Sequence, residues 1–284
     1  MLKQRIVTAI VLLAILLPAL FWRTPVPFLF VTLVLMAAAG WEWGKLNGYA
    51  QGPSLALGAL LFAACIGAWA LDWTGRPSAI LWTVVGAAWV LGGAFLLKKG
   101  VAGWPTVPKP VRLVGGLLAL WAAWLAVAQA RVVGVNFLLS ILVLVWVADV
   151  SAYFAGRAFG LKFTKNKLAP SISPGKSWEG VWGGMAGVVV LAVAWVFADA
   201  SSQAAVPSVY TRLAQVGWPV LALAVVFLAA MSVVGDLAES LVKRSAGAKD
   251  SSQLLPGHGG VLDRVDALLP TLPLAMMLAS ITAR

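Results

Sequence analysis

Charged residues and glycines gather near the C-terminal end of a chain that is otherwise apolar. The segment KDSSQLLPGHGGVLDRVD, residues 249–266, contains the single histidine, His258, and three of the ten acidic residues. Its Pro-Gly pair at 256–257 predicts a helix break, and the Gly-Gly pair at 259–260 lets the backbone approach a bound group closely. Backbone N–H groups in such a turn, with a helix N-terminus after it, can hold an anion. The segment therefore indicates a phosphate site.

Basic and acidic side chains flank this glycine-rich turn on both sides. Basic groups that hold phosphates, mixed with carboxylates that hold a divalent metal, are what phosphoryl transfer requires. Oxygen ligands without a histidine or cysteine cluster favour Mg²⁺ or Mn²⁺ over Zn²⁺. His258 has two open roles, since it could cap the turn or donate to a phosphate oxygen. The flanking residues are Lys243, Arg244, Lys249, Asp263, Arg264 and Asp266.

The preceding segment, VVGDLAESLVKRS at 233–245, has a polar face when it is read as a helix. That face carries Asp236, Glu239, Ser240, Lys243 and Arg244, and apolar residues occupy the other side. Two interpretations stay open: a solvated helix end, or a polar stripe that faces a cavity inside a helical bundle. The position of Asp236 beside the apolar run favours the cavity.

A second polar window covers residues 149–180. Asp149, Tyr153 and Arg157 recur at helical spacing, and a basic loop follows. The GKS at 175–177 resembles the end of a P-loop, but proline stands at position 170 where that pattern needs glycine, so a Walker A site is excluded. A loop with Ser171, Ser173, Lys176 and Ser177 suits a nucleotide triphosphate or a lipid phosphate. Membrane topology accounts for part of its positive charge.

The elements that position these residues must lie in a membrane. Of the 284 residues, 61% are hydrophobic and 11% are charged, whereas soluble domains are about half apolar and a quarter charged. The single Cys65 excludes a disulfide framework and a C-x-x-C metal or redox site. The net charge of +11 is spread between apolar runs, so it indicates contact with anionic membrane lipids and not with nucleic acid.

We expect an all-α polytopic membrane protein of about nine transmembrane helices. A span needs about 20 mostly apolar residues. With the N-terminus in the cytoplasm and the C-terminus outside, five of the 21 lysines and arginines fall outside: Arg23, Arg76, Arg131, Arg212 and Arg284. The other 16 lie inside, as the positive-inside rule requires. The predicted spans are 6–22, 27–43, 54–72, 79–97, 113–130, 134–150, 180–198, 217–235 and 265–282.

The signature SLVKRSAGAKDSSQLLPGHGGVLDRVD, residues 240–266, resembles that of the phosphatidate cytidylyltransferases, also called CDP-diacylglycerol synthases. Segments such as WEWGKL at 41–46 and SPGKSWEGVWGG at 173–184 also resemble bacterial members. One departure is Gly175, where a second lysine is common, so Lys176 is the expected phosphate ligand of that loop. The fixed signature positions are filled by Ser240, Lys243, Arg244, Lys249, Asp250, Pro256, His258, Gly259, Gly260, Asp263, Arg264 and Asp266.

The resemblance implies transfer of the cytidylyl group of CTP to phosphatidate, with release of pyrophosphate. It implies Mg²⁺ or Mn²⁺ on Asp236 and Asp263, with Asp149, Asp250 and Asp266 as additional candidates and room for a second cation. Catalytic residues would be Lys249, Asp250, His258, Arg264 and Asp266. Phosphate-binding residues would be Lys176, Ser177, Ser240, Lys243, Arg244, Gly259 and Gly260.

The resemblance also bears on organisation and location. It implies a bacterial cytoplasmic membrane protein whose active site faces the cytoplasm, and it allows a homodimer. We expect residues 1–130 to form a scaffold or lipid-cavity wall and residues 131–284 to form the catalytic region.

Two other functions stay open from the residues alone. An ion-coupled transporter would use acids such as Asp149 and Asp236 to carry protons or cations, but it has no need of a loop packed with lysine, glycine and histidine. A CTP-dependent polyprenol or phytol kinase would also bring a nucleotide to a membrane lipid. It would transfer the terminal phosphate and leave no nucleoside on the lipid.

Overall fold

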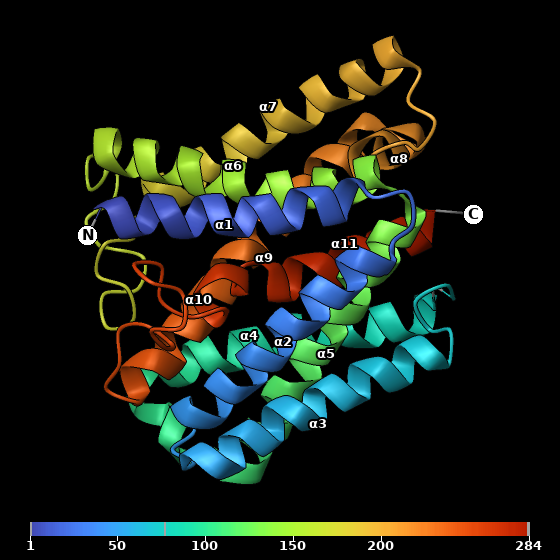
Figure 1. Cartoon of the computed structure of the whole chain (residues 1–284). Coiled ribbons are helices and arrows are strands. Elements are labelled where there is room, and N and C mark those ends of the chain that lie inside the picture. Colours follow the sequence, from blue (N-terminus) through green and yellow to red (C-terminus); the bar gives the residue numbers. More distant parts are fainter. Residues whose placement is uncertain (1, 77, 283–284) are drawn as a thin grey trace.

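The computed structural model describes residues 2–76 and 78–282, and within them the chain is helical without a β-strand. Figure 1 shows long helices joined by short loops, with the two longest loops at the end of the bundle where α1 begins. The helices are α1 Leu2–Phe21, α2 Val26–Leu46, α3 Gln51–Ala70, α4 Ala79–Gly103, η1 Trp104–Thr106, α5 Lys109–Val133, α6 Val135–Phe159, α7 Trp178–Ser202, α8 Val209–Val216, α9 Trp218–Ser245, α10 Leu262–Val265 and α11 Leu268–Thr282.

Nine helical segments in these described ranges are long and apolar enough to cross a membrane. The prediction of an all-α polytopic membrane protein with about nine spans is therefore confirmed. Most helices run further than their predicted spans, and two of these extensions carry polar residues of the predicted site. α6 continues to Phe159 and carries Tyr153 and Arg157 beyond the apolar run, and α9 continues to Ser245 and carries its polar face there.

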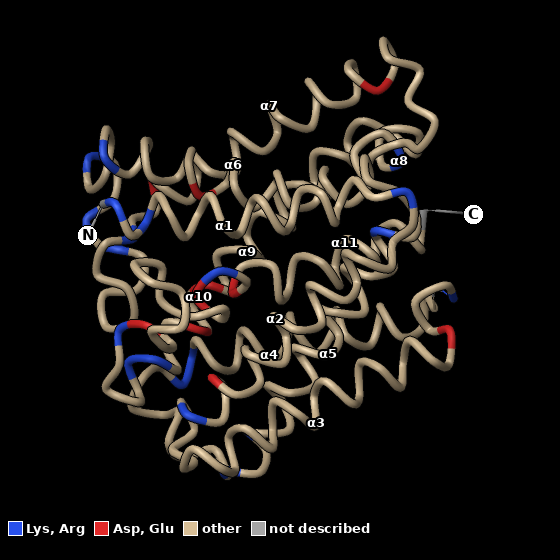
Figure 2. The backbone as a smooth tube through the Cα atoms, in the orientation of Figure 1, with Lys and Arg blue, Asp and Glu red and all other residues tan. Residues whose placement is uncertain are grey.

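The distribution of charge agrees with nine crossings. In Figure 2, lysines and arginines crowd the end of the bundle where α1 begins, together with the loops that follow α6 and α9. Few charges mark the opposite end. The positive-inside rule would place the crowded end in the cytoplasm, and this orientation stays a prediction. Arg284, which entered the charge count, lies outside the described residues.

α9, which carries Asp236 and Glu239, occupies the interior of the bundle together with α11. α9 packs against α4, α7 and α11, and α11 also packs against α4 and α5. α6 and α7 form a close pair, because a Cβ added to Gly183 would overlap the Cβ of Ala155. Side chains on the outer faces remain apolar and exposed, as Ile80 and Leu223 illustrate, which suits contact with lipid.

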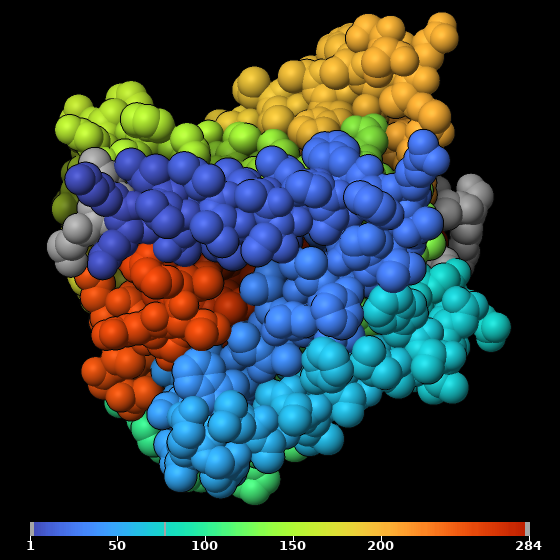
Figure 3. All heavy atoms as spheres, viewed as in Figure 1, coloured from blue at the N-terminus to red at the C-terminus, as the bar shows by residue number. Residues whose placement is uncertain are grey.

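α1 lies along the outside of the bundle and is attached near both of its ends (Figure 3). At its C-terminal end, Arg131 of α5 donates to the carbonyl oxygens of Leu20 and Trp22 at 2.9 and 2.6 Å. Near its start, the Thr8 hydroxyl donates to the carbonyl of Pro256 at 2.9 Å. The first helix therefore reaches the glycine-rich turn, from the opposite end of the sequence.

Candidate active site

The two polar windows of the sequence meet at an ion pair between Lys176 and Asp236. Lys176 ends the loop between α6 and α7, and its Nζ lies 2.5 Å from Oδ2 of Asp236 on α9. The other carboxylate oxygen of Asp236 accepts a 3.1 Å hydrogen bond from the Ser240 hydroxyl, one helical turn further along α9. Three predicted site residues are thus in direct contact. On the polar face of α9, Glu239 is buried, Asp236, Ser240 and Lys243 are partly buried and only Arg244 is exposed, which favours the cavity over the solvated helix end.

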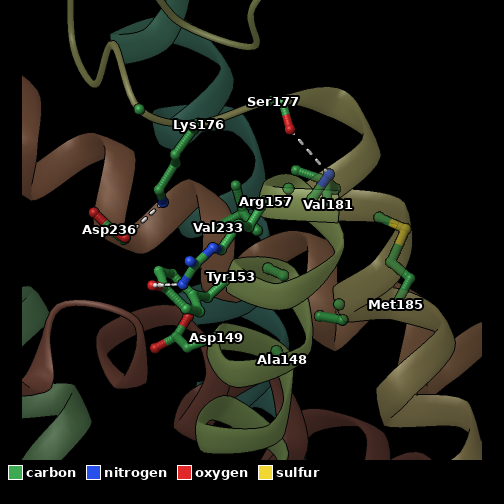
Figure 4. Close-up of a pocket in the computed structure, with 16 residues that line it drawn as sticks. Ala148, Asp149, Tyr153, Arg157, Lys176, Ser177, Val181, Met185, Val233 and Asp236 are labelled. Carbon is green, nitrogen blue, oxygen red and sulfur yellow. Dashed lines mark hydrogen bonds and ion pairs between the residues drawn. The ribbon is translucent and has the colours of Figure 1, made fainter. Parts of the chain in front are cut away.

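A pocket of about 450 Å³ lies beside this ion pair, between α6, α7 and α9. Figure 4 shows Lys176 and Asp236 at its rim, with Asp149, Tyr153 and Arg157 rising from α6 on the same side. Arg157 donates to the Tyr153 hydroxyl at 3.4 Å. The remaining lining residues are mostly apolar or glycine and include Ala148, Val181, Met185, Ala229 and Val233. The pocket therefore combines a charged rim with an apolar wall.

A second cluster centres on Lys243, also on α9. Its Nζ lies 2.5 Å from Oε2 of Glu239 and 2.5 Å from Oδ1 of Asp263. All three side chains are almost completely buried. Glu239 was recognised as part of the polar helical face but was not among the predicted site residues. Its position one turn before Lys243 on that face was the available signal.

The second oxygen of Asp263 binds the glycine-rich segment. Its Oδ2 accepts hydrogen bonds from the backbone N–H of Ser251 at 2.8 Å, the Ser251 hydroxyl at 2.8 Å and the N–H of Gly260 at 2.7 Å. Gly257 and Gly259 have φ values of +75° and +81°, in the region that favours glycine. The turn thus binds an anion, as its composition indicates, and this anion is a carboxylate of the protein itself.

A fully buried carboxylate from α2, Glu42, also binds this segment. It accepts hydrogen bonds from the N–H groups of Val261 and Leu262 and from the hydroxyls of Ser251 and Ser252. In the sequence Glu42 stands within the WEWGKL segment at 41–46, and no role was predicted for it. Placing a carboxylate inside a membrane span costs free energy unless the carboxylate has polar partners. The position of Glu42 within the predicted span 27–43 was therefore a signal that it has a specific role.

The loop between α6 and α7 is fixed by another buried acid, Glu179, in the first turn of α7. Its Oε1 accepts hydrogen bonds from the N–H of Phe163 at 3.1 Å and from the N–H and hydroxyl of Thr164 at 2.7 and 2.8 Å. The predicted phosphate ligand Ser177 caps the same helix, with its hydroxyl accepting from the N–H of Gly180 at 3.2 Å. Lys176 is therefore held between an ordered loop and a capped helix.

The remaining predicted site residues lie around these clusters without ion pairs in the described structure. Lys249, Asp250, Arg244 and Arg264 are exposed at the loop surface. They are free to meet a solvated ligand. His258 is half-buried, its N–H closes the turn onto Leu255, and its Nδ1 has no hydrogen-bond partner in this arrangement.

The carboxylates have a composition that fits a divalent metal. Asp149, Asp236 and Asp266 lie close enough to interact electrostatically, and so do Glu239 and Asp266. In residues 2–76 and 78–282, no three acidic, histidine or cysteine side chains converge on one point. Mg²⁺ commonly takes one or two carboxylates together with substrate phosphates and water, so a full protein cage is not required. The donor set fits Mg²⁺ or Mn²⁺.

Carboxylates and lysines gathered inside a membrane bundle, beside a basic loop and a glycine-rich turn, define an enzyme that handles phosphate groups. Comparison with known proteins makes the class specific. The model of the cytidylyltransferase family matches residues 3–282. The chain belongs to this family, and it is a nucleotidyltransferase.

Relatives with similar sequences are found in several bacteria. A Pseudomonas aeruginosa protein named phosphatidate cytidylyltransferase is 38% identical over 285 residues, which cover 96% of this chain and 95% of the relative. A Haemophilus influenzae protein of the same name is 37% identical over 296 residues, with 96% of each chain covered. One from Brucella abortus is 37% identical over 286 residues, covering 99% of this chain and 94% of the relative. The similarity therefore includes the N-terminal helices.

Proposed function

We propose that this enzyme transfers the cytidylyl group of CTP to phosphatidate, forming CDP-diacylglycerol and pyrophosphate. The names of its relatives support this substrate pair. The observation that carries the proposal is the Lys176–Asp236 contact at 2.5 Å, which joins the basic loop after α6 to the polar face of α9 at the rim of one pocket. A phosphate held by this loop and one held by the residues at the end of α9 would meet there.

The reaction is an exchange of phosphate bonds. A phosphate oxygen of phosphatidate attacks the α-phosphorus of CTP, and the bond to the bridging oxygen of the β-phosphate breaks. The attacking oxygen is already ionised at neutral pH, so no strong general base is required. The main obstacle is the repulsion between two anions, which positioned cations offset. A chain with a single histidine can therefore carry out this chemistry.

Basic side chains offset part of the repulsion between the two phosphate groups. Lys176 and Arg157 line the pocket and would contact phosphate oxygens there, with the Ser177 hydroxyl beside them. Lys243 holds Asp263 in place from within the bundle. Arg244, Lys249 and Arg264 are exposed and would hold the outer phosphates of CTP together with the turn at His258, Gly259 and Gly260.

A divalent metal completes the proposed site. Asp236 and Asp263 would be its main protein ligands, with Asp149, Asp250 and Asp266 as further candidates and room for a second cation. When bound, Mg²⁺ or Mn²⁺ would neutralise charge on the phosphates as they are brought together and as pyrophosphate leaves. Asp236 and Asp263 would then exchange part of their contact with Lys176 and Lys243 for the metal.

The apolar wall of the pocket suits the lipid substrate. Val181, Met185 and Val233 line it below the charged rim, so the acyl chains of phosphatidate can remain in an apolar environment while the phosphate reaches Lys176. The positive charge at this end of the bundle would place the site at the cytoplasmic face of a bacterial inner membrane. Anionic lipids would contact the exposed lysines, and a homodimer stays a prediction.

The test is product analysis with purified protein in mild detergent, CTP, phosphatidate and Mg²⁺. Mass spectrometry should find CDP-diacylglycerol and pyrophosphate from the wild type and very little from Asp263→Asn. Asp72→Asn is the matched control, because Asp72 is an exposed acid paired only with Arg76 in the described structure. A phosphorylated lipid together with CDP would instead identify a lipid kinase. If folded protein forms no product with both substrates present, the proposal is wrong and an ion-coupled transporter is favoured.

A further inference from the structure

Glu42 is a buried acid in an unusual setting. It lies on α2 in the N-terminal half of the chain, with a side chain that is 0% exposed. None of the four ion pairs in the described residues includes it. A buried carboxylate without a cationic partner is costly unless hydrogen-bond donors surround it. Such an arrangement therefore needs a specific set of donors.

The hydrogen bonds that Glu42 accepts come from the loop after α9 and from the start of α10. Oε1 accepts from the Ser252 hydroxyl at 2.6 Å and the N–H of Val261 at 2.9 Å. Oε2 accepts from the N–H of Leu262 at 2.8 Å and, more weakly, from the Ser251 hydroxyl at 3.3 Å. One carboxylate thus holds both the start and the end of the 251–262 segment.

Ser251 links Glu42 to the proposed metal ligand Asp263. Its hydroxyl lies 3.3 Å from Oε2 of Glu42 and 2.8 Å from Oδ2 of Asp263, and its single proton can be given to only one of them at a time. Gly260 lies between the two acids and donates its N–H to Asp263 at 2.7 Å. A Cβ on Gly260 would overlap Glu42 and Ser251, so the acids are packed against the same backbone.

We propose that Glu42 is a positioning residue: it binds the 251–262 segment so that Asp263 faces the phosphate and metal site. In this role Glu42 acts through the segment and through Asp263, and not by its own contact with substrate or metal. The effect of Glu42 on catalysis rests on the proposed function. Its effect on the order of the 251–262 segment is independent of that function. The N-terminal half of the chain then contributes directly to the geometry of the active site.

The first test measures the segment itself by hydrogen exchange of the full-length protein in detergent. In Glu42→Gln the neutral amide has one oxygen for two backbone N–H groups, and its own NH₂ cannot accept. We expect the amides of Val261 and Leu262 to exchange about tenfold faster or more, as the loss of a charge-assisted hydrogen bond predicts. Helical amides far from the segment should keep wild-type exchange rates.

Asp199→Asn is the matched control. Asp199 is also buried, and it accepts hydrogen bonds from the N–H of Ser208, from Thr211 and from Asn136, at the junction of α7 and α8. Its loss should speed exchange around Ser208 and leave 251–262 unchanged. If both variants speed exchange of 251–262 equally, the effect is global destabilisation and the proposal is wrong.

The second test separates positioning from simple stability. Glu42→Gln should raise the Mg²⁺ concentration needed for half-maximal activity and lower kcat by about tenfold, with the KM for phosphatidate within about twofold. Mn²⁺ binding, followed by electron paramagnetic resonance without substrates, should weaken in parallel. Glu42→Asp keeps the charge on a shorter side chain and should recover part of the loss.

Failure of the positioning role of Glu42 can be distinguished from failure of the proposed reaction. Faster exchange of 251–262 with weaker Mn²⁺ binding supports the positioning role even if the reaction proves to be another one. Unchanged exchange of this segment in Glu42→Gln overturns it. If that variant does not fold, Ser252→Ala removes one donor and should still speed exchange of 251–262, whereas wild-type exchange there would overturn the proposal.

Discussion

Lys176 and Asp236 form an ion pair with 2.5 Å between Nζ and Oδ2, although one belongs to a loop after α6 and the other to α9. This contact joins two polar windows that are separated along the chain by the whole of α7 and α8. It also sets the charged rim of the pocket between α6, α7 and α9. The site is therefore shared between three helices and is not confined to the C-terminal signature.

Removing the charge of Lys176 should lower catalytic activity more than it lowers the stability of the fold. In Lys176→Met we expect kcat/KM to fall by about 100-fold, because a cation that offsets phosphate charge in the transition state is lost. Steady-state kinetics with CTP and phosphatidate varied separately would measure it. Lys98→Met, in a basic segment at the end of α4, is the control and should retain activity. Similar losses in both variants would mean that surface charge in general matters, and not this ion pair.

The buried Glu239–Lys243–Asp263 cluster should contribute to stability as well as to activity. Glu239→Gln leaves Lys243 with one carboxylate in a buried environment. We expect the free energy of unfolding to fall by about 2 kcal/mol. The apparent Tm in detergent should fall by about 5 °C. A thermal shift assay would measure this change, and an unaltered Tm would show that Asp263 alone satisfies Lys243.

Gly260 should not tolerate even one added methyl group. In Gly260→Ala the new Cβ would overlap Ser251 and Glu42, so the turn must move and Asp263 loses its N–H donor. We expect activity to fall by at least about 100-fold, with a lower apparent Tm. Gly67→Ala is the matched control, because nothing lies within 4 Å of a Cβ at that position. If Gly260→Ala is as active as this control, the turn is looser than its hydrogen bonds indicate.

Metal removal should abolish turnover reversibly. The site offers carboxylate oxygens and substrate phosphates, which suit Mg²⁺ and Mn²⁺, and it lacks a histidine or cysteine cluster in the described chain. We expect EDTA to reduce activity to background and excess Mg²⁺ or Mn²⁺ to restore it, whereas Zn²⁺ should not. Product formation that persists in EDTA, with trace metals excluded, would show that basic side chains suffice.

Much of this protein follows from its sequence alone. Nine spans could be read from hydropathy because the thickness of a bilayer demands about 20 apolar residues for each crossing. The phosphate chemistry of residues 240–266 could be read because lysines, aspartates and glycines at fixed positions are rare in so apolar a chain. Lys176, Asp236, Ser240, Lys243 and Asp263 were predicted as site residues from such patterns and from the family resemblance, and the structure places each of them in one of the two clusters.

Only the tertiary structure showed which acids serve the site and how. Glu42 is separated from its partners by more than two hundred residues, and Glu179 turns back to bind the loop before it. Local periodicity reports which face of a helix is polar, but it carries no information about which distant segment packs against that face. The glycine-rich turn likewise binds carboxylates of the protein, because burial forces its N–H groups to find acceptors within reach. The partners of buried charges are decided by packing.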